Sequence, residues 1–291
     1  MSPFDVHPSQ YPMEELISKT EISGSVTKMP FAEINEISMH YHDVGEGIPV
    51  VLVTGFSGDT TFFKGLIPDL VDEGYRVITF DHRGAGLTSY PMEKGIHAQT
   101  MVSDLADLVD YLKIGKAHYL GWSLGAHVMQ EYAVQFPERL MSLTLVSAYP
   151  YHPARSSYFM NGICDCALAG GPPEYISMMT NAFCFTEDFF MGLEEKGRKL
   201  RSLEGLNPRG LKMQMNALDE FDTREKVKDI KAPTLSIHGL SDIMVEPKLG
   251  DFISDRIPNC KVLRIPDVGH VIKPSLYSEE FIKFIRSHDE A

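Results

Sequence analysis

The feature that most constrains the fold of this chain is a regular alternation of short β-rich runs with longer amphipathic segments. Residues of high β-propensity recur at 36–44, 49–55, 75–81, 117–121, 140–148, 233–239 and 260–266. Between them, segments such as 100–112, 124–136 and 277–287 repeat apolar residues at three- and four-residue steps, which indicates helices. Strands alternating with helices build a parallel sheet with helices on both faces. The sequence therefore predicts an α/β protein.

The alternation breaks once, between about residues 149 and 230. Gly-Gly-Pro-Pro at 170–173 opens a stretch rich in Met and Phe, which indicates an inserted helical cap, or lid. Residues 1–28 show no clear periodicity and are predicted to form an N-terminal arm, extended or partly disordered. The expected organisation is thus an arm (1–28), a core (29–148 and 231–291) and a cap (149–230).

The acidic composition of the chain argues against two classes of binding partner, nucleic acids and membranes. Acidic residues outnumber basic ones by 40 to 27 in the 291 residues, and the formal charge of −13 repels phosphate backbones and anionic membrane surfaces. Neither nucleic acid nor a membrane is expected as a partner. The first twenty residues lack the basic start and apolar stretch of a secretory signal, and no run approaches the ~18 apolar residues of a membrane span. We expect a soluble, cytoplasmic protein, either a monomer or a homodimer.

The four cysteines do not indicate a disulfide scaffold or a metal site. Cys164, Cys166 and Cys184 lie close together in the sequence, whereas Cys260 stands apart. The first three could form a metal cluster with His152, but the spacing matches none of the paired C-x-x-C patterns typical of zinc sites. We interpret the cysteines as buried or half-buried thiols and expect neither a metal nor a cofactor.

The stretch YLGWSLGAHV, residues 119–128, places Ser123 between a β-rich run and a helical one. A nucleophilic serine needs a tight strand–turn–helix corner with small residues two positions to either side, and Gly121 and Gly125 occupy those positions. A helix that begins at the serine also points its unpaired N–H groups toward an oxyanion forming there. The alternative is a chance G-x-S-x-G in an ordinary turn; the strand before it and the helix after it favour the nucleophile.

A serine nucleophile needs a base, and a carboxylate that orients the base. Among eleven histidines, His270 lies in the loop PDVGHVIKP directly after the last predicted strand, at the carboxyl edge of the sheet. His127 is the alternative base, but its helix carries it away from the serine oxygen. Asp242, in the loop HGLSDIMVEP after another predicted strand, is the expected acid, with Glu246 in reserve. The chain order nucleophile, acid, base is known for one fold among those that use this triad.

The motifs GWSLG, HGLSD, VGH and DHRGAGLTS, with the run EFDTREKVKDIKAPTLSIHG, resemble the α/β-hydrolase superfamily over residues 30–288. The resemblance implies a mostly parallel, eight-stranded sheet flanked by helices, with a helical cap inserted after the sixth strand. It also implies an oxyanion hole made by the backbone N–H groups of Phe56 and Leu124. Thr54 replaces the histidine usual in the loop VTGFSGD, which puts the shape of that loop in doubt. Arg83, in the glycine-rich turn DHRGAGLTS, is expected to form a structural ion pair.

Together these observations predict a cofactor-independent serine hydrolase that cleaves a small, mainly apolar carboxylic ester or lactone. Its expected partner is a small-molecule substrate. Tyr149 and Phe183, from the Met- and aromatic-rich cap, are candidate substrate contacts. Trp122, beside the serine, is a third candidate, although packing under the corner is the alternative interpretation. Hydrolysis of an amide or carbon–carbon bond by the same triad, and a non-catalytic ligand receptor on a hydrolase frame, remain as alternative functions.

Overall fold

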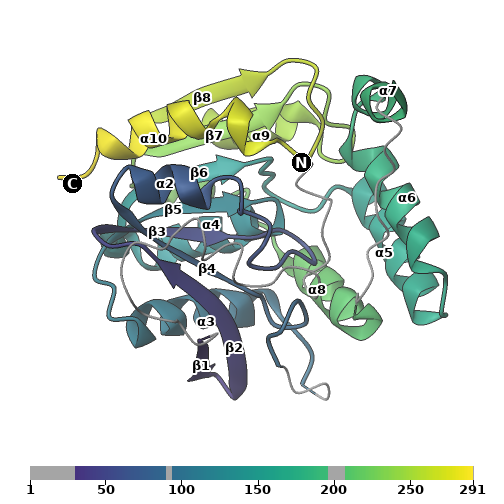
Figure 1. Ribbon diagram of the computed structural model, residues 1–291, viewed down its shortest axis with the longest axis horizontal. Helices are drawn as coiled ribbons and strands as arrows, with labels where there is room; N and C mark the ends of the chain where they lie inside the picture. The colour runs from purple at the N-terminus through teal and green to yellow at the C-terminus, as the bar shows by residue number, and fades with distance from the viewer. Residues whose placement is uncertain (1–29, 90–93, 196–206, 291) are drawn as a thin grey trace.

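One eight-stranded, mostly parallel sheet forms the centre of the part of the chain that the structure describes (Figure 1). The structure is a computed structural model, and it describes residues 30–89, 94–195 and 207–290. The strands follow the order β1-β2-β4-β3-β5-β6-β7-β8 across the sheet. The β1–β2 and β2–β4 pairs are antiparallel, and the other pairs are parallel. The strands are β1 (Phe31–Ile34), β2 (Ile37–Val44), β3 (Ile48–Val53), β4 (Tyr75–Phe80), β5 (Ala117–Trp122), β6 (Leu140–Val146), β7 (Thr234–Gly239) and β8 (Cys260–Ile265). The predicted sheet is confirmed.

The sequence pattern identifies every strand of this sheet except β1. This strand is four residues long and pairs with β2 through a hairpin in which Ile34 faces Ile37. The turn residues Asn35 and Glu36 both have a positive φ, 46° and 62°, which matches the twist of a two-residue hairpin. Such turns usually contain glycine. Because this one does not, no turn signal separates the two strands in the sequence.

Helices cover both faces of the sheet, as the burial of its central strands shows. Every residue of β5, β6 and β7 is buried, which in a parallel sheet requires a layer of helices on each side. The helices outside the predicted cap are α2 (Ile67–Asp72), α3 (Ala98–Tyr111), α4 (Leu124–Gln135), α9 (Pro247–Ser254) and α10 (Ser278–Arg286). Within the described ranges, no helix combines the length and the apolar character needed to cross a membrane.

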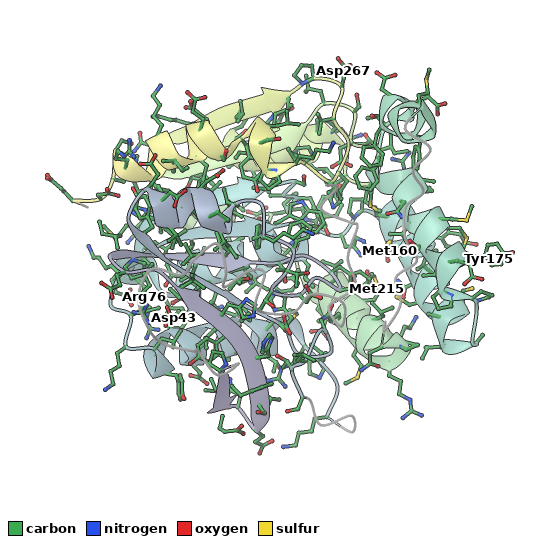
Figure 2. All side chains as sticks on the ribbon, viewed as in Figure 1. Asp43, Arg76, Met160, Tyr175, Met215 and Asp267 are labelled. Carbon is green, nitrogen blue, oxygen red and sulfur yellow. The ribbon has the colours of Figure 1, made fainter. Side chains whose placement is uncertain are left out.

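The segment predicted as a cap, 149–230, is helical where the structure describes it. The helices are α5 (Ala154–Leu168), α6 (Pro173–Cys184), α7 (Glu187–Glu195) and α8 (Pro208–Glu220), all between β6 and β7. In Figure 1, α5, α6 and α7 lie together at one end of the molecule, with α8 closer to the sheet. Met160 of α5 and Met215 of α8 are buried, whereas Tyr175 of α6 points outward (Figure 2). Movement of these helices as a lid stays a prediction; the predicted arm, 1–28, lies outside the described residues.

The last cap helix, α8, is joined to the core at both ends. At its start, a methyl group on Gly210 would lie 2.0 Å from the carbonyl oxygen of Gly84, so the two backbones are in direct contact. At its end, Glu220 accepts a hydrogen bond from the Ala98 N–H at 3.0 Å. Because a glycine is needed for the first contact, α8 packs as part of the core and not as a loosely attached cover.

Candidate active site

Ser123 occupies a strained corner between β5 and α4. Its backbone angles, φ 53° and ψ −114°, are disfavoured for a residue with a side chain. Two glycines make the corner possible. A methyl group on Gly121 would lie 2.5 Å from the carbonyl oxygen of Gly125, and one on Gly125 would lie 2.2 Å from that of Val53. The glycine spacing seen in the sequence therefore has a steric cause: the helix backbone crosses β5 and β3 with no room for a Cβ.

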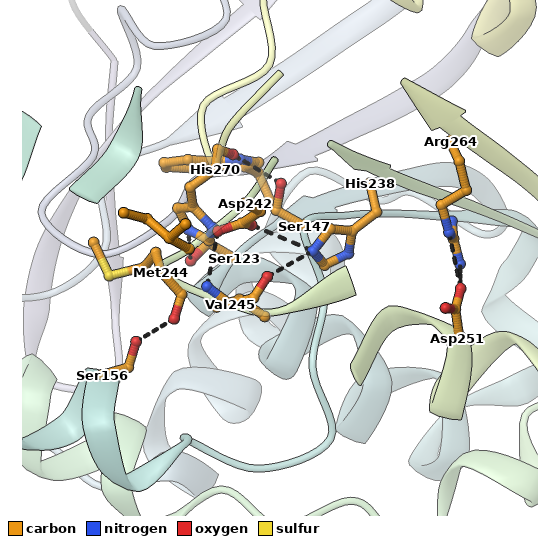
Figure 3. Close-up of polar contacts among 12 residues, drawn as sticks. Ser123, Ser147, Ser156, His238, Asp242, Met244, Val245, Asp251, Arg264 and His270 are labelled. Atoms are coloured by element: carbon orange, nitrogen blue, oxygen red, sulfur yellow. Dashed lines mark hydrogen bonds and ion pairs between the residues drawn. The ribbon is translucent and has the colours of Figure 1, made fainter. Parts of the chain in front are cut away.

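The structure brings the other two predicted triad residues to this corner (Figure 3). Nε2 of His270 is 3.0 Å from Oγ of Ser123, and Nδ1 of the same ring is 2.8 Å from Oδ2 of Asp242. A carboxylate only accepts hydrogen bonds, so Nδ1 carries the proton and Nε2 is left to accept the serine hydroxyl proton. Asp242 follows β7 and His270 follows β8, and both loops lie at the carboxyl edge of the parallel sheet.

Asp242 is held as an anion although its side chain is fully buried. Burial alone would raise the pKa of Asp242, but the adjacent imidazoles of His270 and His238 lower it to about 2. Nε2 of His238 is 3.3 Å from Oδ2, and the Val245 N–H donates to Oδ1 at 2.8 Å. The carboxylate is therefore ionised at neutral pH and able to orient His270 and stabilise its protonated form.

The loop that carries His270 is fixed by two side chains from neighbouring strand ends. The hydroxyl of Ser147, directly after β6, donates to the His270 carbonyl oxygen at 2.8 Å, and the indole N–H of Trp122 donates to the same oxygen at 3.4 Å. The Trp122 ring stacks on Phe62 at a centroid distance of 4.3 Å and is 9% exposed. Trp122 thus packs beneath the His270 loop, and a contact between Trp122 and substrate stays a prediction.

Tyr149 lies beside the serine, and Phe183 lies in the cap. Burial raises the pKa of the Tyr149 phenol well above its ordinary value, and a hydrogen bond with Ser123 partly opposes the rise. The phenol is therefore protonated at neutral pH, and it lies next to the Ser123 side chain. Phe183, near the end of α6, stacks on Phe159 of α5 at 3.9 Å. Its contact with a substrate stays a prediction.

The two predicted oxyanion donors, Phe56 and Leu124, lie in the loop after β3 and at the first residue of α4. Among the residues that the structure describes, neither backbone N–H donates a hydrogen bond, so both are available to a ligand. The loop after β3, in which Thr54 replaces the histidine of the family pattern, is held by two hydrogen bonds. The Thr54 hydroxyl donates to the Gly58 carbonyl oxygen at 3.2 Å, and the Ser57 N–H donates to Oε1 of Gln214 in α8 at 2.9 Å.

Three cap helices are hydrogen-bonded to the three loops that carry the site. The Ser156 hydroxyl of α5 donates to the Met244 carbonyl oxygen in the loop of Asp242 (Figure 3). The Cys184 carbonyl oxygen of α6 accepts from the Val271 N–H, next to His270, at 3.3 Å. Gln214 of α8 makes the third contact, with the Phe56 loop. The position of the cap is therefore coupled to the loops that carry Asp242, His270 and Phe56.

The reaction centre is closed in this structure. Ser123 is 6% and His270 is 4% exposed. Two surface cavities of about 500 and about 510 Å³ lie elsewhere: the first borders Arg83 and Gln99, the second borders Lys261 and Glu280, and neither is lined by a triad residue.

The alternative residues considered from the sequence lie away from the serine oxygen. His127 packs against the rings of Tyr149 and Phe221, at centroid distances of 4.3 and 5.2 Å. Glu246 is exposed and pairs with Lys248. Arg83 forms the expected ion pair, a buried one, with Asp104 of α3. In the described ranges, no group of three or more His, Cys, Asp or Glu side chains is arranged to hold a metal ion.

Three supporting residues are not identified by sequence reasoning: His238, Ser147 and Gln214. In the sequence, His238 is predicted to lie at the end of a strand. Its four-residue spacing from Asp242 is the only signal that it contacts the Asp242 carboxylate. Ser147 directly follows a predicted strand, a place where functional side chains gather, but nothing points to a partner in the His270 loop. Gln214 carries no signal at all, because its two partners are distant in the sequence.

Comparisons with known proteins agree with this fold. A family model described as alpha/beta hydrolase fold matches residues 48–274. The chain is 30% identical over 260 residues to the putative non-heme bromoperoxidase BpoC of Mycobacterium tuberculosis, a match that covers 86% of this chain and 98% of that protein. It is 26% identical to the putative carbamate hydrolase RutD of Azorhizobium caulinodans, covering 90% of this chain and 100% of that protein. A solved structure of a malate-bound esterase from Thermogutta terrifontis, 26% identical, matches with a TM-score of 0.77 and covers 91% of this chain and 100% of its own.

Proposed function

The chain belongs to the α/β-hydrolase family, and on that premise we propose that it is a serine hydrolase that cleaves a small, mainly apolar carboxylic ester or lactone through an acyl-enzyme. The observation that carries the proposal is the 3.0 Å approach of Nε2 of His270 to Oγ of Ser123, at a corner with a strained backbone. Strain of this kind persists only where the surrounding packing enforces it, and it is concentrated at functional sites.

In the proposed reaction, Oγ of Ser123 attacks the substrate carbonyl carbon while Nε2 of His270 takes the hydroxyl proton. Asp242 stabilises the imidazolium through its contact with Nδ1, 2.8 Å away. The carbonyl oxygen becomes an oxyanion and accepts hydrogen bonds from the N–H groups of Phe56 and Leu124. When the tetrahedral intermediate collapses, the carbon–oxygen bond breaks and His270 returns its proton to the departing alcohol.

Deacylation repeats the sequence with water. His270 takes a proton from the water as it attacks the acyl carbon, the second tetrahedral intermediate collapses, and Ser123 recovers its proton as the acid leaves. The phenol of Tyr149 stays protonated and next to Oγ of Ser123. It therefore does not compete with His270 for the serine proton.

The first test is the Ser123→Ala variant. Because it removes the nucleophile and leaves the fold intact, we expect turnover of p-nitrophenyl esters to fall by several orders of magnitude. A fluorophosphonate probe should label the wild type with one equivalent per chain and leave the variant unlabelled. Near-normal ester turnover by Ser123→Ala would refute the proposal.

A second candidate function is hydrolysis of a carbamate or amide, which the likeness to the protein named RutD favours. The same triad can perform this reaction, since the attack of Ser123 and the collapse of the tetrahedral intermediate are unchanged and only the groups on the carbonyl carbon differ. A panel of p-nitrophenyl esters of rising acyl length, lactones, carbamates and anilides ranks these substrates by kcat/KM. Stoichiometric labelling with slow turnover of every member would favour carbon–carbon bond hydrolysis. No labelling would favour a ligand receptor.

A further inference from the structure

A second histidine–carboxylate pair lies on the chain segment that leaves β6. Nδ1 of His152 is 2.6 Å from Oδ1 of Asp219 in α8, and the His152 side chain is 5% exposed. Asp219 is itself held by the hydroxyl of Ser157, 2.8 Å from Oδ1, and by Nδ2 of Asn161, 3.0 Å from Oδ2. Both of these residues belong to α5. The pair is therefore built into the contact between α5 and α8.

This pair faces the reaction centre. His152 is close enough to His270 for the two imidazoles to interact electrostatically. Its ring centroid lies 6.1 Å from that of Tyr149, whose phenol lies next to the Ser123 side chain. Asp219 also acts electrostatically on Tyr149. The His152 imidazole therefore lies beside Tyr149, the residue next to Ser123, on the segment that leads from β6 into the cap.

The contact with Asp219 determines which nitrogen of His152 is available. Since the carboxylate only accepts, Nδ1 carries the proton and Nε2 holds a lone pair. Within the described part of the chain, Nε2 has no hydrogen-bond partner. Burial lowers the pKa of His152, and His270 lowers it further, against the opposing effect of Asp219. At neutral pH the ring is therefore uncharged, and Nε2 is a hydrogen-bond acceptor.

His127, the other buried histidine of this region, cannot serve in the same way. Both of its ring nitrogens are completely buried and, among the described residues, without a partner. Tyr149 and Phe221 enclose the ring, and burial lowers its pKa to about 3. A substrate has no route to these nitrogens without displacing Tyr149. His152 is thus the candidate on this side of the serine.

We propose that His152, oriented by Asp219, is a substrate-binding residue that accepts a hydrogen bond from a hydroxyl or N–H group of the substrate. This inference rests on the serine hydrolase function proposed above. The neutral His152 ring, paired with the Asp219 carboxylate, favours an uncharged hydrogen-bond donor on the substrate. It disfavours a carboxylate on the substrate, which would lie close to Asp219. The substrate class is then a small ester or lactone that carries one hydroxyl or amide N–H group, and not a wholly apolar ester.

The test uses two pairs of substrates in which a methyl group replaces a hydroxyl group. One pair places the difference on the acyl side, p-nitrophenyl butyrate against p-nitrophenyl 3-hydroxypropionate; the other places it on the alcohol side, propyl acetate against 2-hydroxyethyl acetate. We expect the wild type to prefer the hydroxyl member of at least one pair by about tenfold in kcat/KM. His152→Leu should reduce that preference to about one, while His152→Gln, which keeps an acceptor oxygen, should retain part of it.

Fluorophosphonate labelling separates the two proposals. Equal labelling rates in the wild type and in both His152 variants show that the triad is intact, so a change in preference reports on His152 alone. His97→Leu is the matched control, because His97 forms a histidine–carboxylate pair with Glu220 that is exposed; it should leave the preference unchanged. No labelling of the wild type would contradict the serine hydrolase. Normal labelling with no hydroxyl preference in the wild type, or with a preference that survives in His152→Leu, would overturn the role of His152.

Discussion

The Gln214→Met substitution isolates the contact between the cap and the predicted oxyanion loop. Gln214 is fully buried in α8; its Oε1 accepts from the Ser57 N–H and its Nε2 donates to the Arg83 carbonyl oxygen, both at 2.9 Å. Methionine has the same chain length and fills the same space, but it can replace neither hydrogen bond. The substitution therefore removes the polar contacts without opening a cavity.

The expected loss of stability follows from the burial of the two partners. Arg83 is buried, so its carbonyl oxygen is left without a partner at a cost of about 1–3 kcal/mol. Ser57 is only half-buried, so water can replace Gln214 there, and the net loss is about 1 kcal/mol. The apolar burial of the methionine side chain offsets about 1 kcal/mol. We expect the free energy of unfolding, from urea denaturation, to fall by about 1–3 kcal/mol.

The expected effect on catalysis is a loss in kcat with little change in KM. Complete removal of one oxyanion donor costs about 10²–10³ in kcat. Gln214 holds Ser57, the neighbour of the donor Phe56, so loosening this loop should cost less, about ten- to a hundredfold. Because oxyanion donors act on the transition state more than on the bound ester, the KM should change less than twofold.

Gln99→Met is the control for this prediction. Gln99 and Gln135 exchange two hydrogen bonds, of 3.0 and 3.1 Å, on the exposed surface. The same change there should alter the unfolding free energy by no more than about 0.5 kcal/mol and leave kcat unchanged. A Gln214→Met enzyme that is less stable but has an unaltered kcat would refute the reasoning, because the loop would then hold its shape without the cap.

Two further predictions concern the other loops of the site. A methyl group on Gly269 would lie 2.5 Å from the Cys184 carbonyl oxygen of α6, so Gly269→Ala should displace either the cap or His270 and slow fluorophosphonate labelling by at least about tenfold. Gly162→Ala in α5 is the control: nothing lies within 4 Å of the added methyl group, so labelling should be unchanged. Equal labelling rates in the two variants would contradict the predicted effect of the Gly269 contact. The fall in the pKa of Asp242 from 3.8 to about 2 on folding stabilises the protein by about 2 kcal/mol above pH 4, and this is lost as the pH falls toward 2. Urea denaturation of the wild type and of Asp242→Asn should therefore show a stability difference that shrinks by about 2 kcal/mol between pH 5 and pH 2, and a difference independent of pH would be inconsistent with the ionised, paired carboxylate.

Much of the fold is predictable because its signals are local. The period of apolar residues distinguishes strands from helices within windows of ten to fifteen residues, and the strands β2 to β8 appear in the sequence within a few residues of their ends. The corner at Ser123 is predictable for the same reason, since the two glycines that permit it lie within two residues of it. The sequence pattern does not identify strand β1, because the strand is short and its turn lacks glycine.

The placement of the triad is predictable for a topological reason. The carboxyl ends of parallel strands meet at one edge of the sheet, so a serine, an aspartate and a histidine that each follow a strand lie close together before any distance is known. The distances of 3.0 and 2.8 Å then come from the structure. His238 shows the limit of this reasoning, because a histidine near the end of a strand, four residues before Asp242, is only a weak sign that the two side chains will lie together.

The sequence alone predicts the class of fold, the order of the strands along the chain and the three side chains that meet at the carboxyl edge of the sheet, because each of these follows from residues that are neighbours in the chain or from the direction of parallel strands. The tertiary structure alone shows which cap residues hold the loops of the site and which histidine lies beside Tyr149. Gln214 and Ser57, or His152 and Asp219, are far apart in the sequence, and their contacts depend on how α5 and α8 pack against the core. Packing between distant segments depends on the shapes of whole surfaces, so no local pattern of residues predicts it.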